Sequence, residues 1–232
     1  MASRLQDDPL ILFDGVHACP NVHRDFVEWH RGRGPYVFWA LDIDTPEVRQ
    51  TVSEVAGQLD GLLLCRYRRQ PHITVEVCGF PISFPETPDE FSPDWLASQC
   101  AALRLAAIAP FTLTIGGVSS FASAPFVKVI DPALGIAALR NSLAVNGEPR
   151  LLGDYVPHVT VGLYADAWPA EMLGERLMPF ADRDPLQCRI DRLSLMAYQP
   201  NEIGGPLAGL GHFSLDRQAM EWQIAWPFAA AF

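Results

Sequence analysis

The sequence predicts an α+β or α/β domain built of two lobes. The same order of elements occurs twice, over about residues 36–119 and 126–198: a strand, a helix, a strand that begins Pro-His-x-Thr-Val, a helix and a strand. Apolar residues make up 49% of the 232 residues and charged residues 19%. A chain of this length and composition can bury a sizeable core. Strands alternating with helices in two similar halves indicate two packed sheet-and-helix units.

An irregular N-terminal extension precedes the first predicted strand. Residues 17–34 mix His, Arg, Gly and Pro with few apolar residues, and we expect one short helix at 24–30. The run Arg31-Gly32-Arg33-Gly34 is too short for an RNA-binding tail and is typical of a flexible hinge. The predicted organisation is an N-terminal extension over residues 1–34 and one two-lobed domain over residues 35–232. The lobes cover about 35–122 and 123–232 and can exchange strands.

Helix-start signals and apolar runs delimit the first half. Thr45 and Ser92 are N-cap residues, each followed by a proline at the first helical position, and they predict helices to about residues 59 and 108. Apolar runs predict the strands at 36–43, 62–67, 71–78 and 111–115. A Pro-rich loop covers 81–93, and we expect Gly116-Gly117 to turn the chain.

The second half continues in the same way. Asp131-Pro132 predicts the start of a helix to about residue 145, and a further helix covers 169–180. The predicted strands are 126–130, 155–164, 186–198 and 221–226. The Gly-rich loop 204–211 lacks a Gly-Lys-Ser/Thr end, so it is not a P-loop, and we expect it to form a mobile rim over the cleft.

Composition excludes several classes of protein. The net charge of −10 argues against a protein that coats long nucleic acid, since such binding needs many phosphate-neutralising side chains. It leaves room for a small phosphate substrate in a local pocket. No apolar run approaches the roughly 18 residues of a membrane helix. Five cysteines without a CxxC pair, after a polar N-terminus, predict a cytoplasmic protein in a reducing compartment.

Two matching segments carry the candidate chemistry. Residues 71–75 read PHITV and residues 157–161 read PHVTV. In a strand, residues i and i+2 point to the same face, so the His and the Thr of each segment project together. A duplicated motif of this length has a low risk of arising by chance. The four residues are His72, Thr74, His158 and Thr160.

This set of side chains suits a phosphodiester. If the two copies pair about a pseudo-twofold axis, two imidazoles face each other across one cleft, close enough to hold one phosphate. One neutral His can take a proton from a nucleophile, and a protonated His can give one to the leaving oxygen. The Thr hydroxyls can hydrogen-bond the non-bridging oxygens. This chemistry needs no metal or cofactor, and it predicts a bell-shaped pH dependence with limbs on either side of neutrality.

With these motifs the sequence resembles the 2H phosphoesterase superfamily, and within it the 2′-5′ RNA ligase-like cyclic phosphodiesterases. The resemblance covers about residues 36–227 and includes Phe111–Gly117 with the following Phe121. It implies a bilobal α+β fold with a central cleft and hydrolysis or transesterification at a 2′,3′-cyclic or 2′-5′ phosphodiester. It makes the two motif histidines the acid/base pair and the two threonines the phosphate holders. We expect a monomer that acts on a nucleotide or an RNA end.

Five further residues are candidate substrate contacts, and each has a structural alternative. Arg66 and Arg68 share a face of the predicted 62–67 strand region and could meet substrate phosphate, or could guard a solvated edge strand. Lys128 could line the cleft or lie on the surface. Phe121 and Tyr198 could stack on a base or belong to the core.

Other features are weaker. Glu76 falls on the face of the first motif and could orient a side chain there or lie exposed further along the strand. The set His17, Cys19, His23 and His30 fits no zinc-ligand spacing, so we predict no metal site. Three alternatives to the cyclic phosphodiesterase stay open: RNA end-joining or oligonucleotide end-trimming at the same site, a non-catalytic nucleotide-binding module, and a metal-dependent hydrolase, which the lack of a ligand cluster disfavours.

Overall fold

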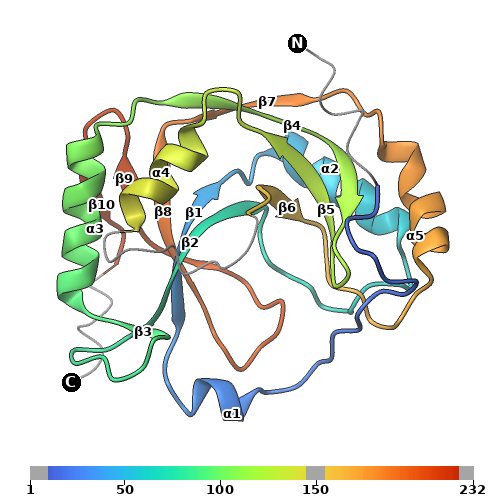
Figure 1. Cartoon of the computed structure of the whole chain (residues 1–232), viewed down its shortest axis with the longest axis horizontal. Helices are drawn as coiled ribbons and strands as arrows, with labels where there is room; N and C mark the ends of the chain where they lie inside the picture. The colour runs from blue at the N-terminus through green and yellow to red at the C-terminus, as the bar shows by residue number, and fades with distance from the viewer. Residues whose placement is uncertain (1–9, 145–154, 225–232) are drawn as a thin grey trace.

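A computed structural model describes residues 10–144 and 155–224 (Figure 1). In this part of the chain the strands form two sheets. The six-stranded sheet has the order β10 (Ala219–Trp222), β9 (Ala208–Ser214), β8 (Arg192–Tyr198), β1 (Tyr36–Asp42), β2 (His72–Pro81) and β3 (Glu90–Phe91). The four-stranded sheet has the order β6 (His158–Thr160), β5 (Pro125–Ile130), β4 (Phe111–Ser120) and β7 (Leu186–Ile190).

Helices flank the two sheets. The described helices are α1 (Val27–His30), α2 (Pro46–Gln58), α3 (Pro93–Ala106), α4 (Gly135–Leu143) and α5 (Ala170–Leu177), which continues into the 3₁₀ turn η1 (Met178–Phe180). In Figure 1, α3 lies at one side of the molecule and α5 at the opposite side, with both sheets between them. The predicted α+β class with two sheet-and-helix lobes is confirmed. None of the described residues forms a helix long and apolar enough to cross a membrane.

The predicted starts of α2 and α3 are confirmed. The side-chain oxygens of Thr45 and Ser92 accept the backbone N–H of the third residue of α2 and of α3, at 3.3 and 3.2 Å. These bonds satisfy one of the otherwise unpaired donors at each helix end. The helix α4 begins at Gly135, later than predicted, but the Asp131 carboxylate still accepts a backbone N–H of its first turn at 2.7 Å. Residue 145, the predicted end of this helix, lies outside the described residues.

Several strand predictions are wrong. Residues 62–67 form no strand, only the isolated bridge of Leu63 with Tyr164. Their apolar side chains pack on the core without pairing, so an apolar run alone misidentified the segment. The expected turn at Gly116-Gly117 is an irregularity inside β4, which continues to Ser120. The second motif strand has three residues instead of ten, and β9 occupies part of the predicted Gly-rich loop.

The predicted long strand 186–198 divides at Asp191 between the two sheets. Its first part, β7, pairs with β4, and its second part, β8, pairs with β1. The C-terminal strands β8, β9 and β10 therefore belong to the same six-stranded sheet as β1, while β4 belongs to the four-stranded sheet. Strands are thus exchanged between the halves of the chain. The last strand ends at Trp222, and residues 225–226 lie outside the described residues.

The described part of the N-terminal extension runs along the four-stranded sheet. The backbone of residues 10–21 bonds to the end of β4 and to the loops that follow β4 and β6. The N–H groups of Leu12, Ala18, Cys19 and Asn21 donate to the carbonyls of Ser120, Trp168, Ala122 and Tyr164 at 2.7–2.8 Å. These bonds make the extension part of the fold.

The expected hinge at residues 31–34 is held by an ion-pair cluster, so that prediction is wrong. The Arg33 guanidinium contacts the Asp89 carboxylate at 2.6 Å and the Glu90 carboxylate at 3.0 Å, and it donates to the carbonyl of Trp29 at 2.8 Å. It also lies 3.9 Å from the centre of the Phe80 ring. These contacts connect the extension to the loop between β2 and β3.

Both faces of the six-stranded sheet are packed. Its inner positions join the four-stranded sheet and helices α2, α3 and α4 in one core, with side chains such as Trp39, Val75 and Leu96. Its other face carries a smaller apolar cluster of Phe38, Ala40, Met196 and Leu207. The first motif projects from this second face.

Candidate active site

The two His-x-Thr motifs lie on neighbouring strands of different sheets. The strand β2 begins at His72 within the six-stranded sheet, and β6 consists of His158, Val159 and Thr160 at the end of the four-stranded sheet. The two strands meet near the middle of the molecule (Figure 1). Tertiary structure therefore brings together two segments that are 86 residues apart in the sequence.

The two imidazoles are held by the same local hydrogen bond. The Nδ1 of His72 contacts the carbonyl of Gln70 at 2.7 Å, and the Nδ1 of His158 contacts the carbonyl of Val156 at 2.7 Å. A carbonyl can only accept, so Nδ1 carries the hydrogen in both rings. This assigns Nε2 of each ring as the nitrogen that is available for proton transfer.

Burial disfavours the charged form of both imidazoles. The pKa of His72 is lowered to about 4, chiefly by burial and to a smaller extent by the charges of Arg69 and His158, against the hydrogen bond to Gln70. Burial also lowers the pKa of His158. The effect of His158 on His72 shows that the two rings are close enough to interact electrostatically.

Aromatic rings surround both imidazoles. The Phe38 ring lies 5.7 Å from the His72 ring, and Tyr198 lies 6.0 Å from Phe38. On the other side, Phe121 meets the His158 ring edge-on at 4.9 Å and stacks on Phe126 at 4.3 Å. Of the two aromatic residues singled out in the sequence, Phe121 contacts the His158 ring directly. Tyr198 contacts Phe38, which in turn contacts the His72 ring.

The motif threonines have different surroundings. Thr160 is hydrogen-bonded to the hydroxyl of Tyr67, whose pKa is raised by burial. Thr74 lies opposite Ala40 in the β1–β2 pairing, and both threonines are half-buried. Lys128 is directly opposite His158 in the β5–β6 pairing and is 6% exposed, so it belongs to the motif face and not to the surface.

The arginines before the first motif do not lie as predicted. Arg66 and Arg68 are on an exposed loop, and Arg68 forms an ion pair with Glu202. Arg69 instead turns toward the motif: its guanidinium lies 4.3 Å from the centre of the Tyr198 ring and lowers the pKa of His72. Its buried Nε has no hydrogen-bond partner among the described residues. Alternation along a strand misplaced these side chains because the segment is not a strand.

A β-bulge turns Glu76 away from the motif. The β1–β2 register places Trp39 opposite Glu76 and leaves Val75 as an extra residue. Since opposite residues share a face and Trp39 points into the core, Glu76 points there as well. It is 2% exposed, and its carboxylate lies 3.8 Å from the Arg140 guanidinium. The prediction that Glu76 shares the face of the motif His and Thr is wrong.

Arg140 and Tyr155 connect the second half of the chain to the first motif. Arg140, on α4, donates to the carbonyl of Val75 at 2.6 Å, and the Tyr155 hydroxyl donates to the carbonyl of Thr74 at 2.7 Å. The guanidinium also lies 3.9 Å from the centre of the Tyr155 ring. Tyr155 is three residues before His158, so the two motifs are linked through one hydrogen bond. Nothing in the sequence identified these contacts.

Metal ligands do not gather at the motifs. Within residues 10–144 and 155–224, no three His, Cys, Asp or Glu side chains are placed to hold a metal ion. The N-terminal histidines have other contacts: His23 Nε2 lies 2.6 Å from the carbonyl of Cys65, and His30 Nε2 lies 2.5 Å from the Asp25 carboxylate.

Comparisons with known proteins identify the family and proteins of similar fold. The model of the 2′-5′ RNA ligase superfamily matches residues 36–202. TT0787 of Thermus thermophilus is similar in structure, with a TM-score of 0.53, 19% sequence identity, and coverage of 78% of this chain and 97% of that chain. Escherichia coli LigT is similar in its apo form, with a TM-score of 0.51, 16% identity, and coverage of 79% and 98%. LigT with bound NADP+ has a TM-score of 0.50, 16% identity, and coverage of 78% and 98%. A search of curated proteins finds no match.

Proposed function

The chain belongs to the 2′-5′ RNA ligase superfamily, and from this we propose that it is a metal-independent phosphoesterase acting on a 2′,3′-cyclic or 2′-5′ phosphodiester of RNA or a nucleotide. The observation that carries the proposal is the duplicated His-x-Thr motif, in which the same Nδ1–carbonyl bond leaves Nε2 of each ring for proton transfer. The LigT structure with NADP+ supports a nucleotide as the ligand class.

The different burial of the two histidines suggests their roles. His72 is the more buried and has a pKa of about 4, so it is neutral near pH 7 and suits the base that takes a proton from water. His158 is less buried and suits the acid. In hydrolysis of a cyclic phosphate, the water oxygen bonds to phosphorus, the bond from phosphorus to one ribose oxygen breaks, and the acid gives that oxygen a proton. The anionic phosphate favours the charged form of the acid.

Thr74, Thr160 and Arg69 are the candidate phosphate ligands. Hydroxyl and guanidinium donors can follow the charge that develops on the non-bridging oxygens. The Arg69 guanidinium lies over the Tyr198 ring, and its charge acts on His72. Lys128, Phe121 and Tyr198 are the proposed surroundings of the rest of the substrate.

A panel of substrates tests the proposal. We expect turnover of 2′,3′-cyclic mononucleotides, a 2′-5′ dinucleotide or ADP-ribose cyclic phosphate in the presence of EDTA. Turnover that requires added metal would contradict a metal-independent mechanism. Binding of these compounds without turnover of any would instead identify a nucleotide-binding module.

Removal of either motif hydroxyl should slow the reaction moderately. Thr74→Val and Thr160→Val keep the β-branched shape but leave the phosphate charge without a donor, which costs about 1–3 kcal/mol, or about 5- to 150-fold in kcat/KM. Thr112→Val, on an exposed position of β4, is the matched control and should keep full activity. Equal activity of all three variants would remove the threonines from the mechanism.

The pH profile should be displaced toward acid. The base must be neutral and the acid protonated, so kcat/KM should rise with pH through the His72 pKa of about 4 and fall as His158 loses its proton, below the usual imidazole value near 6.5. The profile of kcat should lie at higher pH, because bound phosphate raises both pKa values. A flat profile between about pH 4 and 8 would contradict the paired histidines.

A further inference from the structure

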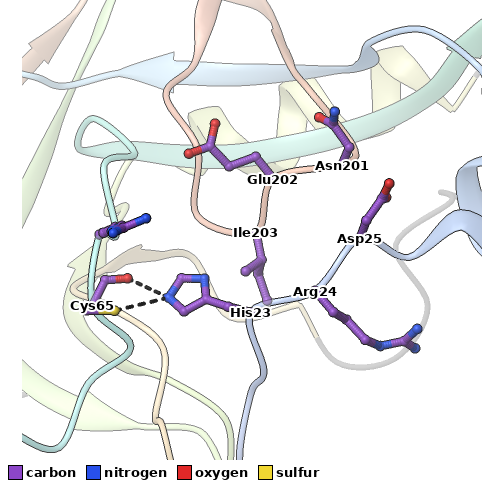
Figure 2. Close-up of a pocket in the computed structure, with 8 residues that line it drawn as sticks. His23, Arg24, Asp25, Cys65, Asn201, Glu202 and Ile203 are labelled. Carbon is purple, nitrogen blue, oxygen red and sulfur yellow. Dashed lines mark hydrogen bonds between the residues drawn. The ribbon is translucent and has the colours of Figure 1, made fainter.

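A pocket of about 370 Å³, within the size range of small-ligand pockets, is lined in part by the loop that precedes the first motif (Figure 2). Three segments form it: residues 23–25 of the extension, Cys65 and Arg66 of the loop before the first motif, and residues 201–203 of the loop after β8. His23 is held against Cys65, and the Ile203 side chain points toward the extension (Figure 2).

The same two loops line the pocket and approach the motifs. Two residues after Cys65, Tyr67 is hydrogen-bonded to the motif residue Thr160. The loop after β8 is tied to this segment, since the Arg68 N–H donates to the carbonyl of Gly204 at 2.8 Å. Gly204 has a positive φ of 68°, and a Cβ there would lie 2.8 Å from the Tyr67 ring. The pocket and the motif site are therefore neighbours, separated by one residue layer around Tyr67.

Two arginines and two carboxylates line the pocket, and three of these four groups have partners. Asp25 contacts His30, Glu202 pairs with Arg68, and Arg24 pairs with Glu28. Arg66 is exposed and takes part in no ion pair among the described residues. Its backbone has a φ of 62°, a left-handed conformation that costs about 1–2 kcal/mol for a non-glycine residue. Strained residues of this kind concentrate at ligand sites.

We propose that this pocket binds the nucleotide next to the scissile phosphodiester, with the Arg66 guanidinium on its phosphate. The inference rests on the proposed function and specifies its substrate class: an oligonucleotide end and not a mononucleotide. The ribose and base would contact Ile203 and the aliphatic parts of the lining. Residues 23–25 precede the segment 36–202 that matches the superfamily, so the extension contributes one of the three walls of this site.

Substrate length tests the proposal. A trinucleotide that ends in a 2′,3′-cyclic phosphate should exceed the cyclic mononucleotide in kcat/KM by about tenfold or more, the usual gain from a charge-assisted phosphate contact. Arg66→Asn should remove most of this advantage, since asparagine tolerates the left-handed backbone but carries no charge. Arg31→Asn is the matched control, because Arg31 is also exposed, has a φ of 50° and lies outside the pocket. Its length preference should equal that of the wild type.

Cysteine protection gives a readout that does not require turnover. Cys65 and Cys19 are both exposed, but only Cys65 lines the pocket. An uncleavable trinucleotide with a 3′-phosphate should slow alkylation of Cys65 by N-ethylmaleimide several-fold and leave Cys19 unchanged, as measured by peptide mass spectrometry.

The outcomes separate the two proposals. Equal kcat/KM for the trinucleotide and the mononucleotide would contradict nucleotide binding in the pocket but not the phosphoesterase activity. Equal length preference of Arg66→Asn and Arg31→Asn would have the same meaning. Absence of turnover with protection of Cys65 that is lost in Arg66→Asn supports the pocket and overturns the phosphoesterase. Absence of both turnover and protection overturns both.

Discussion

His72→Ala and His158→Ala should each lower turnover of a 2′,3′-cyclic phosphate by about 10²- to 10⁴-fold, the usual contribution of general acid–base catalysis. Each substitution removes one half of a proton-transfer pair whose free nitrogens are set by the same carbonyl bond. Groups that act as a unit are non-additive, so the double variant should be little slower than either single variant. Initial rates of cyclic-phosphate opening measure the effect.

The controls separate catalysis from folding. His72→Asn can still donate to the carbonyl of Gln70 but has no titratable nitrogen, so it should be as slow as His72→Ala with a thermal midpoint nearer to that of the wild type. His17→Ala removes an exposed histidine outside the motifs and should keep full activity. Full activity of either motif variant in a folded protein would rule out the mechanism and favour a nucleotide-binding module.

Arg140→Met should destabilise the fold by about 3–5 kcal/mol, the usual result of removing one partner of a buried ion pair. The substitution takes the guanidinium from the Glu76 carboxylate, which is 2% exposed, and takes a donor from the carbonyl of Val75. It also removes the cation that lies over the Tyr155 ring. Urea unfolding monitored by tryptophan fluorescence measures the change.

A second substitution distinguishes lost charge pairing from lost packing. Adding Glu76→Gln to Arg140→Met should recover part of the stability, because the carboxylate left without its guanidinium is then neutral. Arg192→Met removes an exposed partner of Asp191 and should cost less than about 1 kcal/mol. A loss from Arg140→Met as small as that of Arg192→Met would show that the buried pair does not hold the bulge.

Local signals in the sequence predicted the elements that depend on few residues. Thr45 and Ser92 cap helices where their side chains and the following prolines predict it. The PHITV and PHVTV segments predicted two strands with His and Thr on one face, and both strands begin at the motif histidine. Capping and alternation act within one to four residues, which is why a sequence pattern reveals them.

The same signals failed wherever distant segments compete for a position. The strand pattern of residues 186–198 gives no indication that β7 and β8 belong to different sheets, because the partner strands of each part are distant in the sequence. Alternation predicted that Glu76 faces the substrate, but one extra residue in β2 reverses its direction. The extension is irregular with one short helix, as expected, but its pattern gave no indication that Arg33 and the backbone of residues 10–21 pair with segments that are distant in the sequence.

By itself, then, the sequence predicted the candidate reacting groups and the proposed class of chemistry, since the identity and spacing of His72, Thr74, His158 and Thr160 are local properties. Tertiary structure alone decided their environment. Burial lowers the pKa of both histidines. Near His72 the structure places Arg69, where the sequence had suggested Arg66 and Arg68. Hydrogen bonds connect the first motif to Arg140 and Tyr155. Burial, register and electrostatic neighbours arise from long-range packing, which one-dimensional patterns do not contain.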